Sequence, residues 1–307
     1  MAGKGSLSVE TIGIVANVFK PDALSLVARL LAESSARGMH VLLDTDTGRH
    51  VPGIDTMYTD DELARQADIL VVLGGDGTLI SVTKRFSPLN LPVMGVNLGK
   101  LGFLAEVSPD EIEAALEQLQ SGHWSIEHRL MLKATVDHVN SEKGEEYLAL
   151  NDFVIAREAF ARVIDIQLNV DDRLVDLYRG DGLIVATPTG STGYSLSAGG
   201  PVVFPLLKSI LVTPICPHTI GSRPLVLSGQ QTISARVWSG RSEVGVGLTI
   251  DGQFTTRLGD GDTLIVSRAS FPALLVALDN KNFFEILHSK LKGRVKTRLT
   301  REDDLSS

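Results

Sequence analysis

The chain is poor in cysteine and in aromatic residues, and it has no long apolar run. Its 307 residues include a single cysteine, and aromatic residues make up 5% of the chain. One cysteine excludes an internal disulfide and is typical of a reducing compartment, so we expect a cytoplasmic protein. No stretch approaches the ~20 apolar residues of a membrane helix. The short apolar run at residues 11–19 is not followed by a small-residue cleavage site. We therefore expect neither a membrane partner nor a signal peptide.

Basic residues are fewer than acidic residues. The 29 Lys and Arg residues against 37 Asp and Glu residues give a net charge of −8. Proteins that bind nucleic acid through their overall charge are normally basic, so we expect no nucleic-acid partner. An acidic protein that binds phosphates must gain positive potential locally, from helix N-termini, arginines or a metal ion.

The first part of the chain alternates between two periodicities. The length of the whole chain suggests two domains. The run at residues 69–73 is continuously apolar, which is typical of a parallel strand that is covered on both faces. Strand–helix alternation predicts an open, Rossmann-like α/β domain at residues 1–122. The expected strands lie at residues 12–18, 40–43, 69–73 and 92–96, and the expected helices at 22–37, 60–68, 76–85 and 109–120.

After residue 122 the pattern changes to strands joined by short polar turns. Such spacing implies antiparallel pairing, so we predict a β-rich second domain at residues 123–269. The last strand and helix, at 271–278 and 282–291, are expected to return to the first domain, which thus includes residues 270–307. Expected strands of the second domain lie at 129–139, 147–156, 163–170, 173–178, 183–186, 232–238, 244–250 and 263–267.

A glycine-rich loop, Gly74-Gly75-Asp76-Gly77-Thr78, directly follows the apolar strand at 69–73. Glycines let backbone N–H groups approach a phosphate closely, and a helix N-terminus favours anions. We expect Thr78 to cap the helix that follows. The loop lacks the spacing of the dinucleotide and Walker fingerprints. Because Asp76 would repel a phosphate directly, it indicates chemistry on a hydroxyl group or a metal ion.

A second polar segment occupies residues 187–201 and contains four Gly and six Ser or Thr residues. Hydroxyl and amide groups suit a ribose and an adenine, and Tyr194 offers a stacking face. The alternative is a flexible surface loop, although the apolar segments on both sides argue against disorder. The pairs at 151–152 and 251–252 are, by themselves, typical of turns.

Taken in order, these motifs resemble those of the bacterial NAD kinases. They are Gly-Gly-Asp-Gly-Thr at 74–78, Leu-Asn-Asp at 150–152, the run from Asp181 to Pro201, and Pro-His-Thr-Ile-Gly-Ser-Arg-Pro-Leu-Val at 217–226. The resemblance spans about residues 10–292. It implies an α/β N-terminal domain, a β-rich C-terminal domain and NAD bound between them.

The resemblance also implies roles for individual residues. Asp76 corresponds to the proton acceptor, Gly77 lies beside it at the substrate, and Gly74, Gly75, Gly77 and Thr78 form a phosphate loop. Asn151 and Asp152 match a pair that contacts NAD. Further substrate contacts fall at Arg162, Arg179, Asp181, Thr192, Gly193, Tyr194, Ser195, Leu196, Ser197 and Gln253.

The implied reaction transfers the γ-phosphoryl group of ATP to the 2′-hydroxyl of the adenosine ribose of NAD, giving NADP and ADP. The absence of a Walker lysine leads us to expect a divalent cation of the Mg²⁺ type, held mainly by ATP phosphates. The resemblance further implies a homodimer or homotetramer.

Two other functions stay open at this point. A diacylglycerol-type lipid kinase would share the Gly-Gly-Asp-Gly-Thr loop but leave residues 187–201 unexplained. A non-catalytic NAD-binding regulator would keep the NAD site between the two domains. The intact Asp76, Asn151 and Asp152 argue against such a regulator.

Overall fold

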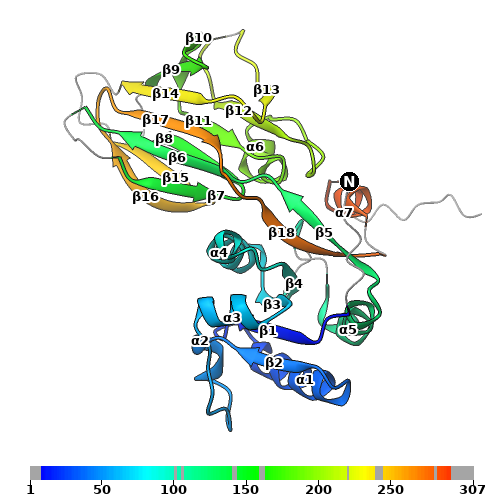
Figure 1. Cartoon of the computed structure of the whole chain (residues 1–307). Helices are drawn as coiled ribbons and strands as arrows, with labels where there is room; N and C mark the ends of the chain where they lie inside the picture. The colour runs from blue at the N-terminus through cyan, green and yellow to red at the C-terminus, as the bar shows by residue number, and fades with distance from the viewer. Residues whose placement is uncertain are drawn as a thin grey trace, which may run out of the picture.

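The computed structural model describes residues 8–99, 102–104, 107–139, 144–158, 163–219, 221–238, 245–279 and 282–291. Its strands form three six-stranded sheets, one mixed and two antiparallel. Figure 1 shows the mixed sheet with its helices below and the two antiparallel sheets above. The predicted fold class, an α/β part followed by a β-rich part, is therefore confirmed.

The mixed sheet has the strand order β2-β1-β3-β4-β18-β5. All neighbours in it are parallel except β5, which runs antiparallel to β18. The last strand of the chain thus returns to the first sheet, as the sequence predicted. The strands are β1 (Thr11–Ala16), β2 (His40–Leu43), β3 (Ile69–Gly74), β4 (Val93–Asn97), β5 (Trp124–Arg129) and β18 (Ala273–Leu278).

Helices cover both faces of this sheet. Every residue of β3 is buried, because its successive side chains point alternately to two separate cores. Val71 packs in the core that includes Leu30, and Val72 packs in the core that includes Leu79. The first core is covered by α1 (Ala23–Ala36) and α5 (Ile112–Ser121), and the second by α3 (Asp60–Gln66) and α4 (Asp76–Phe86). Short helices are α2 (Thr45–Gly48), η1 (Ser87–Leu89) and η2 (Pro109–Glu111).

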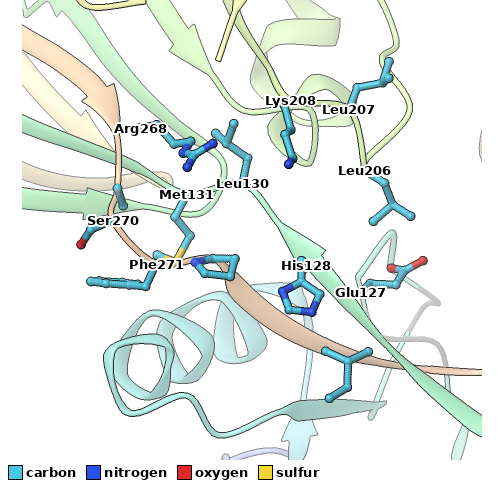
Figure 2. A pocket seen from close by; sticks show the side chains of 13 residues that line it. Glu127, His128, Leu130, Met131, Leu206, Leu207, Lys208, Arg268, Ser270 and Phe271 are labelled. Atoms are coloured by element: carbon cyan, nitrogen blue, oxygen red, sulfur yellow. The ribbon is translucent and has the colours of Figure 1, made fainter. Parts of the chain in front are cut away.

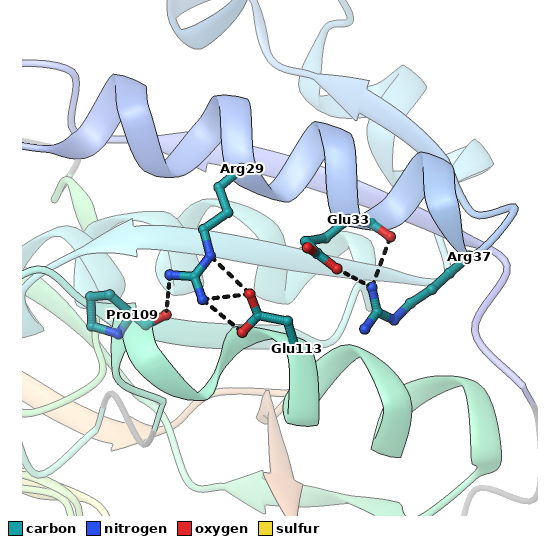
Figure 3. Close-up of polar contacts among 5 residues, drawn as sticks. All are labelled: Arg29, Glu33, Arg37, Pro109 and Glu113. Carbon is teal, nitrogen blue, oxygen red and sulfur yellow. Dashed lines mark hydrogen bonds and ion pairs between the residues drawn. The ribbon is translucent and has the colours of Figure 1, made fainter.

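An ion pair joins the two helices on the first of these faces. Arg29 of α1 donates from Nε to Glu113 Oε1 at 2.9 Å and from Nη2 to Glu113 Oε2 at 2.7 Å. Its Nη1 also donates to the carbonyl oxygen of Pro109 at 3.0 Å (Figure 3). Both charged side chains are 38% exposed, so solvent screens the pair and its net contribution to stability is small. The apolar contacts of α1 and α5 dominate their packing.

The two antiparallel sheets pack face to face. In β9 every second residue is buried, and Ile166 and Leu168 share a core with Phe153 and Ile155 of β8 in the other sheet. One sheet contains β6 (Leu132–Asp137), β7 (Glu146–Ala149), β9 (Ile164–Val170), β10 (Arg173–Gly180), β14 (Ile233–Trp238) and β17 (Thr263–Arg268). The other contains β8 (Asp152–Arg157), β11 (Gly182–Ala186), β12 (Ser209–Ile215), β13 (Leu225–Ser228), β15 (Val246–Ile250) and β16 (Gln253–Leu258).

Two hairpin turns of this sandwich contain residues with positive φ. Asp171 (φ 48°) and Asp172 (φ 63°) join β9 to β10, and Asp251 (φ 49°) and Gly252 (φ 80°) join β15 to β16. Aspartate and glycine tolerate this conformation, and turns of this hand match the twist of antiparallel strands. The hairpin predicted at 171–172 is confirmed.

The helix α7 (Phe283–Leu291) contacts both parts of the molecule. The rings of Phe283 and Phe284 lie 5.7 and 5.8 Å from that of Phe204, which follows the polar segment 187–201. Lys290 Nζ lies 5.3 Å from the centre of the Phe103 ring, in the first part of the chain. The helix therefore bridges the first domain and the loop after residue 201.

The structure departs from the sequence prediction in its strand boundaries. The single strand expected at 147–156 is two strands, β7 and β8, in different sheets. The break falls at Leu150 and Asn151, whose N–H groups donate to the Asp251 carboxylate at 3.2 and 2.7 Å rather than to a neighbouring strand. Strands β5, β12, β13 and β16 were not predicted as such.

The change from one sheet to the next also falls later than expected. The chain leaves the mixed sheet after Arg129, at the end of β5, whereas the sequence pattern put the domain boundary between residues 122 and 123. The division into domains stays a prediction. Within the described part of the chain, no helix is long and apolar enough to cross a membrane.

Candidate active site

The glycine-rich loop lies at the carboxyl end of β3. Gly75 is the N-cap residue of α4 and its backbone is extended, so the helix begins at Asp76. Thr78 therefore lies inside the first turn and is not the cap, contrary to expectation; its hydroxyl accepts from Asn17 Nδ2 at 3.3 Å. A Cβ on Gly74 would lie 2.5 Å from the Thr78 Cβ, so the tight turn requires glycine there. Gly77 faces open space.

Asp76 is the acidic residue of the first turn of α4, where the helix dipole favours a negative charge. Its Oδ2 accepts from the backbone N–H of Phe103 at 3.2 Å. Its Oδ1 is buried and has no hydrogen-bond partner. A Cβ on Gly102 would lie only 1.7 Å from that Oδ1, so only glycine lets the 102–104 segment pass the carboxylate. Asp76 is thus oriented by one donor and keeps one oxygen available.

A cavity of about 510 Å³ opens beside this loop. Its walls include Gly75 and Gly77 of the first part of the chain and Gln253 of β16 in the second. The sequence predicted these three residues and Thr78, which also lines the cavity, as site residues, and the fold brings the four together. The remaining lining residues are Asn17, Lys20, Ser81 and Val82.

Asn17 and Lys20 were not identified from the sequence. They follow the carboxyl end of β1, which pairs in parallel with β3, so they lie at the same edge of the sheet as the glycine-rich loop. Lys20 Nζ would be 3.4 Å from a Cβ placed on Gly75. Ligands of open α/β sheets bind at the carboxyl ends of strands, and that rule would have pointed to both residues.

Asn151 and Asp152 lie at the start of β8, against the polar segment 187–201. The N–H of Thr187 donates to the Asn151 carbonyl at 2.8 Å, and a Cβ on Gly190 would lie 2.2 Å from that same oxygen. The Asp152 side chain is only 4% exposed. Burial, and then the charge of nearby Asp251, raise the pKa of Asp152 to about 7.

The segment 187–201 is ordered by its own hydrogen bonds. The buried Ser191 hydroxyl donates to the Pro188 carbonyl at 2.6 Å and accepts from the Val203 N–H at 3.1 Å. The buried Ser195 hydroxyl pairs with that of Thr213 at 2.9 Å, so it points into the sheet. The flexible-loop interpretation is therefore wrong. Tyr194 is 49% exposed, Gly193 and Ser197 are also exposed, and Thr192 and Leu196 are half-buried.

Two predicted contacts lie apart from the rest. Asp181 precedes β11, whereas Asp152 pairs with Ala186 at the other end of that strand. At ~3.3 Å per residue, this separates them by roughly 16 Å. Arg157 donates to Asp181 at 2.7 Å and lowers the pKa of Asp181. Exposed Arg179 lies 3.8 Å from Asp165. The predicted contact Arg162 lies outside the described residues.

A second cavity, of about 330 Å³, shares no lining residue with the first. Figure 2 shows Met131 and Phe271 on one side of it and His128 and Lys208 on the other. No site residue predicted from the sequence lines it.

Comparison with known proteins gives the family of the whole chain. The family model for the ATP-NAD kinase N-terminal domain matches residues 12–124, and that for the ATP-NAD kinase C-terminal domain matches residues 150–278. The chain belongs to the NAD kinase family. Its activity is the ATP-dependent phosphorylation of NAD to NADP.

Comparisons with individual proteins give the same family. The chain is 44% identical to an NAD kinase from Trichlorobacter lovleyi and 42% identical to one from Geobacter sulfurreducens, in each case over 92% of this chain and 99% of the relative. Among solved structures, it resembles yeast NADH kinase complexed with NADH, with a TM-score of 0.82 at 26% identity over 95% of this chain and 89% of that one. It also resembles an NAD kinase from Archaeoglobus fulgidus in complex with ATP, with a TM-score of 0.69 at 28% identity over 92% of this chain and 98% of that one.

These similarities do not support the lipid kinase or the non-catalytic regulator. Both family models and the relatives named above describe NAD or NADH kinases. For this member of the NAD kinase family, the cavity beside the glycine-rich loop is therefore the candidate active site.

Proposed function

We propose that Asp76 accepts the proton of the 2′-hydroxyl of the adenosine ribose of NAD while the γ-phosphoryl group of ATP is transferred to that oxygen. The observation that carries this proposal is the position of Asp76 in the first turn of α4, between Gly75 and Gly77, which line the cavity, with its buried Oδ1 unpartnered. Oδ2 is held by the Phe103 N–H, so Oδ1 is the oxygen that receives the proton.

Phosphoryl transfer is largely dissociative, so positioning and charge stabilisation matter more than early proton removal. A carboxylate is a weak base, but it accepts the hydroxyl proton late in such a transfer. The N-terminus of α4 and the ammonium group of Lys20 supply positive potential beside Gly75 and Gly77, where the phosphates of ATP bind. Binding of two anionic nucleotides to an acidic protein therefore relies on local charge.

The NAD side of the site is assigned to the residues predicted from the sequence. Asn151 and Asp152 hold the ribose, and the exposed residues Gly193, Tyr194 and Ser197 form the surface for the nucleotide. Because its pKa is about 7, the Asp152 carboxyl is partly protonated at neutral pH and its O–H donates a hydrogen bond. Ser195 supports this surface from inside, through Thr213.

We propose that a divalent cation of the Mg²⁺ type enters this site with ATP rather than being held by a set of protein ligands. In the described part of the chain, no group of three or more His, Cys, Asp or Glu side chains is arranged to hold a metal ion. The phosphates of ATP would supply most of the cation's oxygen ligands, so that Asp76 Oδ1 stays free to receive the proton. When bound, the cation neutralises phosphate charge during transfer.

The test is a coupled assay with pure protein, NAD, ATP and Mg²⁺, in which NADP is detected through glucose-6-phosphate dehydrogenase. Asp76→Asn keeps the shape of the side chain but removes the proton acceptor. We expect kcat to fall by about 10²–10⁴-fold while NAD binding, measured by calorimetry, changes little.

The matched control is Asp46→Asn, which alters an exposed first-turn aspartate of α2 away from the cavity. It should keep wild-type kcat. A turnover in Asp76→Asn close to that of the wild type would remove Asp76 from the proposed role.

We also propose that the chain acts as a homodimer or homotetramer in the cytoplasm. The edge strand β10 carries exposed Leu174, Val175 and Leu177, which a second copy would cover. The family resemblance implies Arg179 and Asp181 as NAD contacts. Asp181 lies roughly 16 Å from Asp152 along β11, and we propose that both residues contact the NAD bound to a neighbouring copy.

A further inference from the structure

One carboxylate, that of Asp251, connects the two halves of the candidate active site. It belongs to the turn between β15 and β16, and its side chain is 2% exposed. Oδ1 accepts from the N–H groups of Asn151 and Asp152 at 2.7 and 3.2 Å. Oδ2 accepts from the N–H of Leu150 at 3.2 Å and lies 2.9 Å from Lys84 Nζ. Four donors therefore converge on a single buried group.

The fourth donor comes from the other part of the molecule. Lys84 is in α4, the helix that begins at Asp76, eight residues earlier. At ~1.5 Å per residue, this places Lys84 about 12 Å further along one rigid helix. Gly77, Ser81 and Lys84 follow the i, i+4, i+7 spacing of one helix face, and the first two line the active-site cavity. Lys84 thus continues the face that forms one wall of the cavity.

The opposite wall is attached to the same carboxylate. Gln253 lies two residues after Asp251 and lines the cavity. The N–H of Asp251 donates to the carbonyl of Asp152 at 3.0 Å, so the turn and the start of β8 are bonded in both directions. The position of Asn151, Asp152 and Gln253 relative to α4 therefore depends on how far Lys84 lies from Asp251.

We propose that Lys84 and Asp251 are positioning residues, and that their ion pair sets the distance between Asp76 and the NAD-binding residues across the cavity. This inference rests on the proposed function of Asp76. Neither residue needs to touch a substrate. An in-line transfer depends on the placement of its reacting groups, and a misplacement of about 1 Å costs on the order of 10²-fold in rate.

The alternative is that the ion pair serves only to stabilise the fold. The geometry separates the two roles, because without Lys84 the Asp251 carboxylate still accepts from three backbone N–H groups. Lys84→Met therefore leaves the local structure of the turn intact and removes only the ion pair between the turn and α4. The Lys84 side chain is 24% exposed, so a methionine of similar length fits beside the same neighbours.

The experiment compares Lys84→Met, Lys84→Arg and Asp251→Asn in the coupled NADP assay with calorimetric NAD binding and thermal unfolding. We expect Lys84→Met to lower kcat by about 10–100-fold, to change the NAD dissociation constant by less than about threefold and to unfold cooperatively. Lys84→Arg restores the cation and should recover kcat to within about threefold of the wild type. Asp251→Asn also weakens the backbone bonds, so it should affect NAD binding as well as kcat.

Lys133→Met is the matched control, since Lys133 pairs with Glu146 at 3.8 Å within one sheet, remote from the cavity. It should keep wild-type kcat. The inference is overturned if Lys84→Met keeps wild-type kcat, or if Lys84→Arg fails to restore it. If Lys84→Met does not fold, Lys84→Gln replaces it under the same criteria.

Failure of the proposed function gives a different pattern. Wild-type protein that makes no NADP, or Asp76→Asn that turns over normally, would refute the role of Asp76 whatever the Lys84 variants do. A severely impaired Asp76→Asn beside a fully active Lys84→Met would overturn only the positioning role.

Discussion

Asp152 is the residue whose chemistry the fold changes most. Its ordinary pKa lies near ~3.9, and burial together with the neighbouring Asp251 charge raises it to about 7. Between these two values the native protein keeps a proton that the unfolded chain has released. The stability that this group contributes is therefore highest below about pH 4 and falls as the pH rises towards 7.

We expect Asp152→Asn to remove this pH dependence. At ~1.4 kcal/mol per pKa unit, the full shift corresponds to on the order of 4 kcal/mol. The wild type should lose stability relative to Asp152→Asn between about pH 4 and pH 7, because in that range the unfolded chain has released a proton that the native wild type still binds. Urea unfolding of both proteins at each pH measures the difference between their free energies of unfolding. Groups that titrate alike in the two proteins do not contribute to this difference. Parallel pH profiles of the two proteins would contradict the shifted pKa.

Asp76 illustrates how far single residues could be interpreted from the sequence. Its position in a glycine-rich loop after an apolar strand was enough to predict a role on a hydroxyl or a metal ion. Its partners were not predictable, because the Phe103 N–H and Gly102 reach it from a separate segment. The same holds for Lys20, which approaches Gly75 only because β1 and β3 are neighbours in the sheet.

At the scale of elements, the contact between the segment 187–201 and the start of β8 is tight. The Thr187 hydroxyl donates to the Leu150 carbonyl at 2.6 Å and accepts from the Gly190 N–H at 3.0 Å. These bonds bring Gly190 so close to Asn151 that no side chain fits between them. The chain therefore needs glycine here for close approach rather than for flexibility.

Gly190→Ala should separate these two elements. The new Cβ would lie 2.2 Å from the Asn151 carbonyl oxygen, so either the segment or the start of β8 must move. We expect the KM for NAD to rise about tenfold or more and the free energy of unfolding to fall by about 1–3 kcal/mol, as for other overpacked sites. Gly221→Ala, where nothing lies within 4 Å of the added atom, is the control. An unchanged KM in Gly190→Ala would show that the contact does not position the NAD site.

Most elements were predictable because their signals are local. The period-2 burial of β9 and the continuous apolar run of β3 follow directly from strand geometry. The break between β7 and β8 had only a weak local signal, the turn-like pair at 151–152, and the strand expected at 147–156 ran through it. The break is made by the carboxylate of Asp251, which is 101 residues away from Leu150 in the sequence.

At the scale of the whole molecule, the proposed homo-oligomer is supported by an edge strand with apolar exposure. Leu174 is 67% exposed and Leu177 is 56% exposed on β10, an outermost strand of its sheet. An edge strand of this kind offers unpaired backbone groups as well as apolar side chains to another chain.

We expect the double substitution Leu174→Glu with Leu177→Glu to dissociate the assembly. Light scattering should give a multiple of 33.0 kDa for the wild type and a value near 33.0 kDa for the variant. Val139→Glu, at another exposed apolar position (59%), should keep the wild-type mass. A wild type that is monomeric, or a double variant of unchanged mass, would argue against this surface as the interface.

The sequence by itself determined the order of strands and helices in outline, the glycine-rich loop at the end of an apolar strand, and the family. These depend on backbone geometry and on motifs that are contiguous in the chain. Only the tertiary structure decided which segments share the cavity, the raised pKa of Asp152, the Lys84–Asp251 ion pair and the distance of Asp181 from the other site residues. Each of these depends on strand order and packing between segments far apart in the sequence, and on the burial that this packing creates.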